Sequence, residues 1–301
     1  MKLNILGCHS ATPRTNTNPT SQVLEIKNHM FLIDCGEGTQ VQLRRNKIKF
    51  SRIKHIFISH LHGDHYFGLI GLVNTFSLLS RETELHIYGP KGLKEVIMLQ
   101  MKLSKGWTKY PLIFHELTSK HSELIFEDDK VEVHTIPLNH RIYTNGFLFI
   151  EKPNDRKLDI NAVVEANIDK AYYNKLKQGF DVKNEDGILI DHKKVTWEAN
   201  PVKSYAFCSD TVYDESIIPL IKNVTVLYHE STFLEKNEAL CKETKHSTAK
   251  HAATIAKKAE VDTLILGHFS TRYNGYKGFK TEAKAVFNNV LLAKDGISFE
   301  F

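Results

Sequence analysis

Three histidines and an aspartate share one short segment, which reads HLHGDH at residues 60–65. The segment follows an apolar run rich in β-branched residues, so it stands at the end of a predicted strand. His60 and His62 lie two residues apart in an extended turn and can point to one cation, while Asp64 and His65 can turn toward a second. The residue types and their spacing therefore predict a site for two metal ions.

Three further candidate ligands follow other predicted strands, because one segment cannot complete the coordination of two ions. They are His140, Asp210 and His268, each soon after an apolar run. Any one of them alone would more often be an ordinary polar residue, but their common placement at strand ends supports a single site. Asp210 can bridge two cations through its carboxylate. Nitrogen and carboxylate ligands without a thiolate favour zinc first, and manganese or iron next.

The pattern of apolar residues also predicts the elements that must position these side chains. Short runs predict strands at residues 2–6, 22–26, 30–34, 55–59, 85–88, 131–136, 146–150, 205–208, 224–228, 263–266 and 297–301. Helical patterns occur at 250–260 and 281–293, and a further helix follows Gly38. This alternation of strands and helices predicts an α/β layered fold.

The chain has 301 residues and no Pro/Gly/Ser-rich stretch that would mark a domain boundary. Residues 151–202 differ from the rest because they are dense in charge, with a possible short helix at 171–177. A core segment would bury more apolar side chains. We therefore expect a single domain over residues 1–301 with an inserted arm at about 151–202.

The composition is typical of a folded, water-soluble protein, with 42% hydrophobic and 25% charged residues. The formal net charge of +5 is compatible with a nucleic-acid partner but does not require one. Cys8, Cys35, Cys208 and Cys241 are far apart and form no CxxC pair, so we expect buried, reduced thiols. The sequence shows no signal-peptide core and no run of about 18 apolar residues, which predicts a cytoplasmic protein without a membrane partner.

A run of six basic residues without an acid follows Gly38. Its members, assigned to the helix after that glycine, are Arg44, Arg45, Lys47, Lys49, Arg52 and Lys54. A solvated helix face is the more common explanation of such a run. A patch that binds phosphate groups is the alternative that stays open.

Several further motifs resemble those of one family. The chain carries ILG at residues 5–7, DCGEGTQ at 34–40, SDT at 209–211, HEST at 229–232, HST at 246–248, GHFS at 267–270 and RY at 272–273. Together with HLHGDH, they resemble the ribonuclease Z branch of the metallo-β-lactamase superfamily over nearly the whole chain. The resemblance implies an αββα sandwich, in which loops after the strands hold metal ions at one edge of two sheets.

The resemblance also implies a role for each candidate residue. One zinc ion would be held by His60, His62 and His140, a second by Asp64, His65 and His268, and Asp210 would bridge the two. Asp64 would also orient the attacking hydroxide. His246, supported by Glu230, would protonate the departing ribose oxygen, a role that suits a histidine that titrates near neutrality. Without the resemblance, His246 is equally well explained as a residue that precedes a helix capped by Ser247.

The implied reaction is the hydrolysis of one phosphodiester of precursor tRNA, after the discriminator nucleotide, which leaves a 3′-hydroxyl on the tRNA. Two zinc ions per subunit would serve this reaction, with manganese as a possible substitute. The inserted arm would clamp the tRNA elbow through its shape and backbone, with Lys170, Lys175 and Arg272 as RNA contacts. The resemblance further implies a homodimer.

Two segments depart from the family pattern. In the loop at residues 13–18, Thr15 and Thr17 replace basic residues, which leaves open how the protein treats tRNAs that already carry CCA. The arm has DKAYYN at residues 169–174 in place of a Gly-Pro cluster, so the contacts of its tip are not predicted.

Two alternative functions stay open. Another binuclear hydrolase of this superfamily would act on small phosphodiesters, thioesters or lactones. A non-catalytic RNA-binding relative would have kept only the fold, but such proteins usually lose metal ligands, and here all seven positions are filled. The HST and HEST motifs and the arm favour tRNA processing.

Overall fold

The structure is a computed structural model that describes residues 1–12 and 14–301, so Pro13, at the start of the loop 13–18, lies outside the described residues. The chain divides into two compact units. The first combines Met1–Ile150 with Lys203–Phe301, and the second is Glu151–Val202. Within the described residues, no helix has both the length and the apolar character needed to span a membrane.

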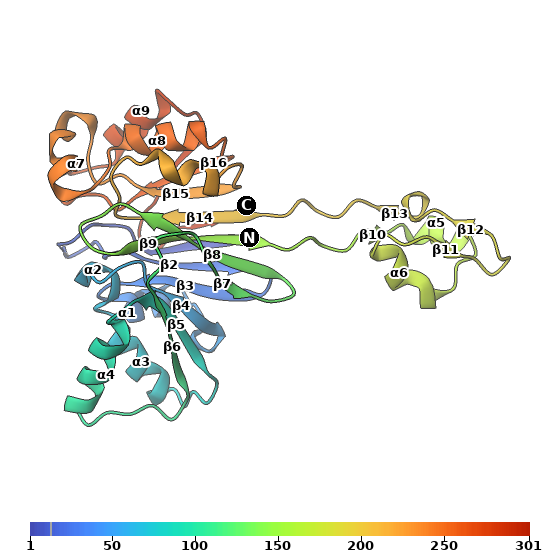
Figure 1. Cartoon of the computed structure of the whole chain (residues 1–301), viewed down its shortest axis with the longest axis horizontal. Helices are drawn as coiled ribbons and strands as arrows, with labels where there is room; N and C mark the ends of the chain where they lie inside the picture. The colour runs from blue at the N-terminus through green and yellow to red at the C-terminus, as the bar shows by residue number, and fades with distance from the viewer. Residues whose placement is uncertain (13) are drawn as a thin grey trace. The chain divides into compact units, whose positions relative to one another are not determined.

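One seven-stranded sheet of the first unit is built largely from the first half of the chain (Figure 1). Its strands are β1 (Lys2–Gly7), β2 (Ser21–Ile26), β3 (His29–Cys35), β4 (Ile53–Phe57), β5 (Leu85–Pro90), β6 (Leu112–Leu117) and β18 (Ser298–Glu300). They are arranged in the order β18-β1-β2-β3-β4-β5-β6. Because β3 to β6 run parallel, their carboxyl ends meet at one edge of the sheet.

The second seven-stranded sheet is built largely from the second half of the chain. Its strands are β7 (Leu124–Glu127), β8 (Val131–Leu138), β9 (Thr144–Glu151), β14 (Ser204–Cys208), β15 (Val226–Glu230), β16 (Thr263–Gly267) and β17 (Val290–Leu292). They follow the order β17-β16-β15-β14-β9-β8-β7. Strands β14 to β17 run parallel, so their carboxyl ends also share one edge.

Helices cover the outer faces of both sheets. They are α1 (Thr39–Arg45), α2 (Gly63–Tyr66), α3 (Leu69–Leu78), α4 (Leu93–Leu103), α7 (Ala239–Thr244), α8 (Ala249–Lys258) and α9 (Lys277–Lys284). In Figure 1, α1, α3 and α4 lie on one side of the paired sheets, and α7, α8 and α9 lie on the other. Helix α8 contacts β15 and β16, whereas α4 contacts β6. The expected αββα sandwich is therefore confirmed.

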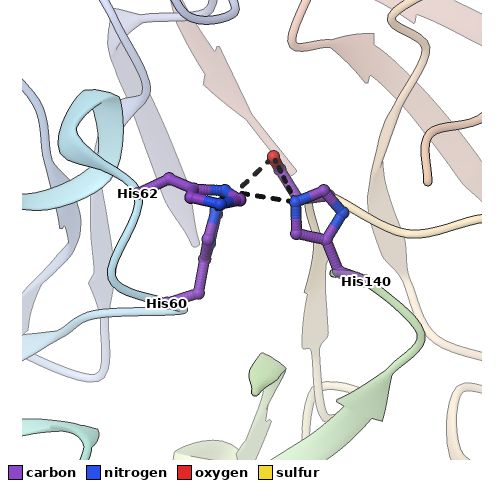
Figure 2. A group of neighbouring side chains, drawn as sticks. His60, His62 and His140 are labelled. Carbon is purple, nitrogen blue, oxygen red and sulfur yellow. Dashed lines mark hydrogen bonds and ion pairs between the residues drawn. The ribbon is translucent and has the colours of Figure 1, made fainter. Parts of the chain in front are cut away.

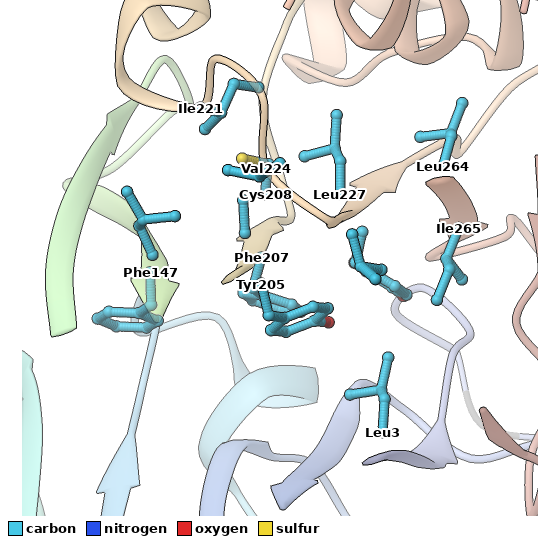
Figure 3. Close-up of a cluster of buried hydrophobic side chains, with 14 of the residues drawn as sticks. Leu3, Phe147, Tyr205, Phe207, Cys208, Ile221, Val224, Leu227, Leu264 and Ile265 are labelled. Atoms are coloured by element: carbon cyan, nitrogen blue, oxygen red, sulfur yellow. The ribbon is translucent and has the colours of Figure 1, made fainter. Parts of the chain in front are cut away.

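The core lies between the two sheets, since each strand turns alternate apolar side chains inward. Aromatic rings meet across this layer: Phe31 and Phe149 have ring centroids 5.3 Å apart, as do Phe57 and Phe147. Figure 3 shows part of the same cluster, where side chains of the second sheet such as Phe207 gather with Leu3 of the first. A separate apolar cluster joins the first sheet to its covering helices. These two buried layers fix the strand ends on which the candidate ligands stand.

The second unit has its own small core. It contains two helices, α5 (Ile160–Glu165) and α6 (Tyr173–Lys177), and four short strands, β10 (Lys157–Leu158), β11 (Val182–Lys183), β12 (Leu189–Ile190) and β13 (Thr196–Trp197). Strand β10 pairs with β13 and β11 with β12. Asp159 begins α5 by accepting a hydrogen bond from the backbone N–H of Ala162. The helix expected at 171–177 is present as a 3-10 turn, Lys170–Tyr172, followed by α6.

Every strand predicted from the sequence is found, with ends no more than two residues from the expected ones. The four cysteines are buried and unpaired, as expected. The elements that were not predicted are strands β6, β7, β10, β11, β12, β13 and β17 and helices α2, α3, α4, α5 and α7. Short 3-10 turns not predicted from the sequence lie at Phe50–Arg52, His192–Lys194, Glu215–Leu220 and Glu235–Asn237.

The predicted helix at residues 281–293 is wrong beyond Lys284. Helix α9 ends at Lys284, and Val290–Leu292 form β17. This strand pairs in parallel with β16, and the side chain of Asn289 donates a hydrogen bond to the backbone oxygen of Asp262 just before β16. Pairing at the edge of the sheet therefore outweighs the helical pattern of the sequence.

The basic run after Gly38 does not lie on one helix, contrary to expectation. Helix α1 ends at Arg45, and the later members lie in a loop, in the turn Phe50–Arg52 and at the start of β4. Lys47 has a φ of 55°, a left-handed conformation that ends the helical segment. The cations are therefore spread over a turn of the chain and do not form a helix face.

Candidate metal centre

The seven predicted ligands come from four strand ends of the first unit. The segment at 60–65 follows β4 and runs into α2, while His140 follows β8, Asp210 follows β14 and His268 follows β16. Asp210 and His268 have φ values of 55° and 56°, in the left-handed region that residues other than glycine rarely adopt. Backbone strain of this kind gathers at functional sites, where the surrounding structure maintains it.

Four ligands form a first group, and Figure 2 labels its three histidines. His62 Nδ1 lies 3.0 Å from His60 Nε2 and 3.2 Å from His140 Nε2. Asp210 Oδ2 lies 3.5 Å from His60 Nε2 and 3.7 Å from His140 Nε2. Three ring nitrogens and one carboxylate oxygen therefore surround one point.

Asp64, His65 and His268 form a second group. Asp64 Oδ2 lies 3.5 Å from His65 Nε2 and 3.7 Å from His268 Nε2. Asp210 Oδ1 lies 3.2 Å from His65 Nε2 and 3.1 Å from His268 Nε2. Because Asp210 presents Oδ2 to the first group and Oδ1 to the second, its carboxylate joins the two.

These separations match those expected around a tetrahedral metal ion. Ligand atoms about 2.0–2.1 Å from a zinc ion lie about 3.3 Å apart when the geometry is tetrahedral. The separations given above for both groups run from 3.0 to 3.7 Å. In addition, the buried Nε2 atoms of His65 and His268 have no hydrogen-bond partner among the described residues. The donor set therefore fits two divalent cations.

Hydrogen bonds to the ring nitrogens that face away from the ligand groups fix the orientation of three histidine ligands. The Nδ1 atoms of His65, His140 and His268 lie 2.6, 2.8 and 2.9 Å from the Asp34 carboxylate, the Lys245 backbone oxygen and the Thr232 hydroxyl, respectively. When Nδ1–H donates to these oxygens, the Nε2 lone pair of each ring faces its ligand group. Such partners set the tautomer and the orientation of a metal-binding histidine.

Asp34 is a functional residue that the sequence reasoning missed. Its buried carboxylate also accepts hydrogen bonds from the backbone N–H and the hydroxyl of Ser59, at 2.7 and 2.9 Å. The residue stands near the end of β3, beside the strand that leads into the ligand segment, with a φ of 55°. Its position near a strand end, within the DCGEGTQ motif, is the signal that could have identified it.

We expect the Asp34→Asn substitution to weaken metal binding about 10- to 100-fold, because the His65 ring loses its charged partner. Competition with a chelator of known affinity measures the change. Asp262→Asn is the matched control, since it alters an exposed carboxylate of the same unit and leaves affinity as in the wild type. Unchanged affinity in Asp34→Asn would contradict the role assigned to Asp34.

Four ligands are held in the protonation states that metal binding requires. The exception is His65, because burial would lower its pKa but the carboxylates of Asp210, Asp64 and Asp34 raise it, so a metal ion at the second group would displace a proton. Burial lowers the pKa of His60 and His62 and brings that of His140 down to about 4, so these rings stay neutral. Burial alone would raise the pKa of Asp210, but His268, His65 and His60 outweigh it and hold the carboxyl ionised. Neutral imidazoles and ionised carboxylates are the forms that coordinate metals.

His246 and Glu230 form a buried pair beside the ligand groups. His246 Nδ1 lies 2.8 Å from Glu230 Oε1 and 4.0 Å from Asp210 Oδ2. Burial lowers the pKa of His246, but the charge and hydrogen bond of Glu230 outweigh it and raise the pKa to about 9. Burial raises the pKa of Glu230, and His246 brings it down to about 2. The imidazole is therefore protonated at neutral pH, and its pKa lies above the near-neutral value expected from the sequence.

Glu230 is itself fixed from three sides. Its Oε1 accepts a hydrogen bond from the backbone N–H of Thr211, and its Oε2 accepts from the backbone N–H and the hydroxyl of Thr232. Because Thr232 also contacts His268, it connects the His246–Glu230 pair to the second ligand group. The orientation of His246 is thus coupled to the metal centre.

The cap of α8 is not the expected one. Thr248 begins the helix, since its side chain accepts from the backbone N–H of His251 in a capping box. The Ser247 hydroxyl instead donates to the backbone oxygen of Thr211, at 2.8 Å. Ser247 therefore ties the loop that carries His246 to the turn that follows Asp210.

The predicted RNA contacts lie outside this cluster. Arg272 is exposed in the loop after β16, in the first unit. Lys170 and Lys175 are exposed in the second unit, where Lys175 Nζ lies 5.7 Å from the ring centre of Tyr172. Their positions therefore give these three side chains no part in metal binding or proton transfer.

Residues 1–152 match the family described as Anti-Pycsar protein Apyc1. The match includes the ligand segment at 60–65 and His140. It ends before Asp210, Glu230 and His246, so it covers the first part of the site only.

Three comparisons over nearly the whole chain complete the identification. The metallo-beta-lactamase fold protein YhfI from Bacillus subtilis has a TM-score of 0.69 at 19% identity, over 99% of this chain and 98% of its own. Fold and site thus define a metallo-β-lactamase-fold protein with a His/Asp cluster suited to divalent metal. The chain belongs to the ribonuclease Z family: it is 44% identical to ribonuclease Z of Bacteroides fragilis over 98% of this chain and 97% of that protein. Human tRNase Z, short form (ELAC1), has a TM-score of 0.73 at 29% identity, over 100% and 99% of the two chains.

Proposed function

We propose that the protein is an endoribonuclease that removes the 3′ trailer of precursor tRNA by hydrolysis of one phosphodiester. The observation that carries the proposal is the buried His246–Glu230 pair, which lies next to the carboxylate that joins the two ligand groups. Relatives named ribonuclease Z and the similarity to human tRNase Z support precursor tRNA as the substrate. A hydrolase of small esters would not need the second unit, and a non-catalytic relative would not need all seven ligands.

Zinc is the metal that the donor set favours, with manganese as the substitute. One ion would be held by His60, His62 and His140. The other would be held by Asp64, His65 and His268, and Asp210 would contact both. When bound, two such ions supply positive charge to the phosphoryl oxygens and activate water at neutral pH.

The chain's own residues position the reacting groups and move the proton. Asp64 orients the attacking water, and its Oδ2 is held by the backbone N–H of Ala11 at 2.8 Å. The water gives up one proton to solvent as its oxygen bonds to phosphorus, and the bond from phosphorus to the ribose 3′ oxygen breaks. His246, whose Nδ1 is engaged by Glu230, donates the Nε2 proton to that oxygen. The tRNA keeps a 3′-hydroxyl, and the trailer carries a 5′-phosphate.

We assign the second unit, the inserted arm of a single metallo-β-lactamase-fold domain, to tRNA binding. Its buried cluster of Val163, Ile168, Leu176, Val182 and Val195 supports a fold of its own. Its surface combines the cations Lys170 and Lys175 with the exposed aromatic rings of Phe180 and Trp197. Cations contact the RNA backbone and aromatic rings stack on exposed bases. Arg272, in the first unit, would contact RNA near the metal centre.

Deletion of the second unit separates tRNA processing from hydrolysis of small esters. Ile150 of β9 pairs with Ser204 of β14, so residues 152–202 can be replaced by a short glycine linker that closes a hairpin. We expect cleavage of precursor tRNA to fall about 100-fold or more, because binding energy far from the scissile bond is lost. Turnover of bis-p-nitrophenyl phosphate should remain. Full tRNA cleavage by the deletion variant would contradict the assignment.

We further propose that the protein is a cytoplasmic homodimer. Large apolar side chains are exposed on and near the first four helices, where a second copy of the chain would cover them. They are Val41, Phe67, Leu78, Met98, Leu99, Leu103 and Trp107. The cytoplasmic location agrees with precursor tRNA as the substrate.

A further inference from the structure

A cavity of about 720 Å³ opens where the residues after α1 meet the end of α3. Five cationic side chains line it, and Glu82 is its one acidic lining residue. The cations are Arg44, Lys47, Lys49, Lys54 and Arg81. Most of them belong to the basic run that the sequence left open between a solvated face and a phosphate-binding patch.

Four of these cations form no ion pair with the described residues. In the described part of the chain, no carboxylate lies within ion-pair distance of Arg44, Lys47, Lys49 or Lys54, whereas the neighbouring Arg52 pairs with Glu25 at 3.2 Å. Arg44 could compensate the negative end of the α1 dipole. The three lysines lie beyond that helix, so this explanation does not extend to them.

Arg81 adds a buried positive charge to the wall of the cavity. It is only 7% exposed, and its guanidinium donates to the backbone oxygens of Ile53, Thr83 and Glu84. The same group lies 4.8 Å from the ring centre of Phe76. These contacts satisfy its hydrogen bonds and hold it rigidly but supply no negative charge. A fixed, uncompensated charge beside an open cavity favours an anionic ligand.

The cavity is separate from the metal centre. Lys54 stands at the start of β4, whereas the ligand segment begins with His60 beyond its other end. Six residues of extended chain span about 20 Å. An anion at the cavity would therefore not be the scissile phosphodiester.

We infer that this cavity, through Arg44, Lys47, Lys49, Lys54 and Arg81, is a second, non-catalytic binding site for the phosphodiester backbone of RNA. The inference rests on the proposed function, because a precursor tRNA presents phosphate groups both at the scissile bond and about 20 Å from it. Several exposed cations around an open cavity suit a polyanionic chain better than a single small anion. Contacts of this kind position RNA without reading its sequence.

The test compares two double variants that remove the same charge. Lys47→Gln with Lys49→Gln alters the cavity, and Lys222→Gln with Lys257→Gln alters exposed lysines of the same unit away from it. Affinity for a 3′-extended precursor tRNA is measured by fluorescence anisotropy over a range of salt concentrations. A chelator prevents cleavage during the measurement, and equal melting temperatures establish that each variant is folded.

We expect the cavity variant to bind precursor tRNA about tenfold more weakly. The slope of the logarithm of its affinity against the logarithm of the salt concentration should fall by about two, because two contacts to phosphate are lost. The control variant should bind as the wild type does. Equal affinity in the cavity variant, or equal weakening in both variants, would overturn the inference. Inorganic tripolyphosphate is the probe for a small anion. If it binds the wild type but not the cavity variant, while both proteins bind tRNA equally well, the cavity is a site for free phosphate and the inference is overturned.

The proposed function fails by a different result. If zinc-loaded wild type makes no cut in precursor tRNA, the function is wrong, whatever the two double variants show. Weaker RNA binding by the cavity variant alone would still support the second site. Normal cleavage with unchanged RNA binding would reject the second site and leave the function intact.

Discussion

Asp210→Ala is expected to lower kcat/KM for precursor tRNA about a thousandfold or more, because one side chain serves both ligand groups. Its two carboxylate oxygens lie 3.1 to 3.7 Å from four histidine nitrogens. Removal leaves buried imidazoles without their shared anion. It would also take one ligand from each of the two proposed ions, which would both contribute to phosphodiester hydrolysis. Metal analysis of the purified variant should show less zinc per chain than in the wild type.

The control for this prediction is Asp262→Ala, which removes an exposed carboxylate of the same unit. It should leave both zinc content and cleavage at wild-type levels. An Asp210→Ala protein that keeps its full zinc content and cleaves precursor tRNA would show that this carboxylate does not join the two sites.

His246→Ala should slow cleavage about 10²- to 10⁴-fold while the metal content stays at the wild-type level. The side chain holds a proton beside the metal centre, and its Nδ1 is engaged by Glu230. It lies close to Asp210 and His268 but outside the two groups that contain His62 and His65. Its loss removes the proton donor for the leaving oxygen and leaves the ions in place. Single-turnover rates together with metal analysis separate these two effects.

Two further variants sharpen this test. Glu230→Gln should cause a smaller loss of rate, because the amide still contacts His246 but no longer raises its pKa. His121→Ala, at an exposed position, should have no effect. Equal loss of metal in His246→Ala and Asp210→Ala would contradict the distinction between proton donor and metal ligand.

The ligand cluster could be predicted because its signals are local in the sequence. HLHGDH places four ligand-type side chains after one apolar strand, and His140, Asp210 and His268 each follow a strand of their own. The structure brings all of them together. Edges of parallel sheets collect such loops, so residue type and strand ends were enough to identify the candidates.

The partners that orient these ligands could not be predicted in the same way. Asp34 contacts His65 only because β3 lies beside β4, a pairing that no local pattern specifies. The cap at Thr248, in place of Ser247, likewise depends on a contact between Ser247 and the distant Thr211. Tertiary contacts also turned Val290–Leu292 into a strand. Local patterns therefore predicted elements and ligands, whereas side-chain partners required the folded chain.

The most direct test of the proposed function is to map the ends produced from a precursor tRNA that carries a 3′ trailer. Zinc-loaded wild type and Asp210→Ala are incubated in parallel, and both product ends are determined. We predict one cut after the discriminator nucleotide by the wild type only, with a 3′-hydroxyl on the tRNA and a 5′-phosphate on the trailer. No cut by the wild type, with turnover of a small phosphodiester, thioester or lactone, would contradict the account.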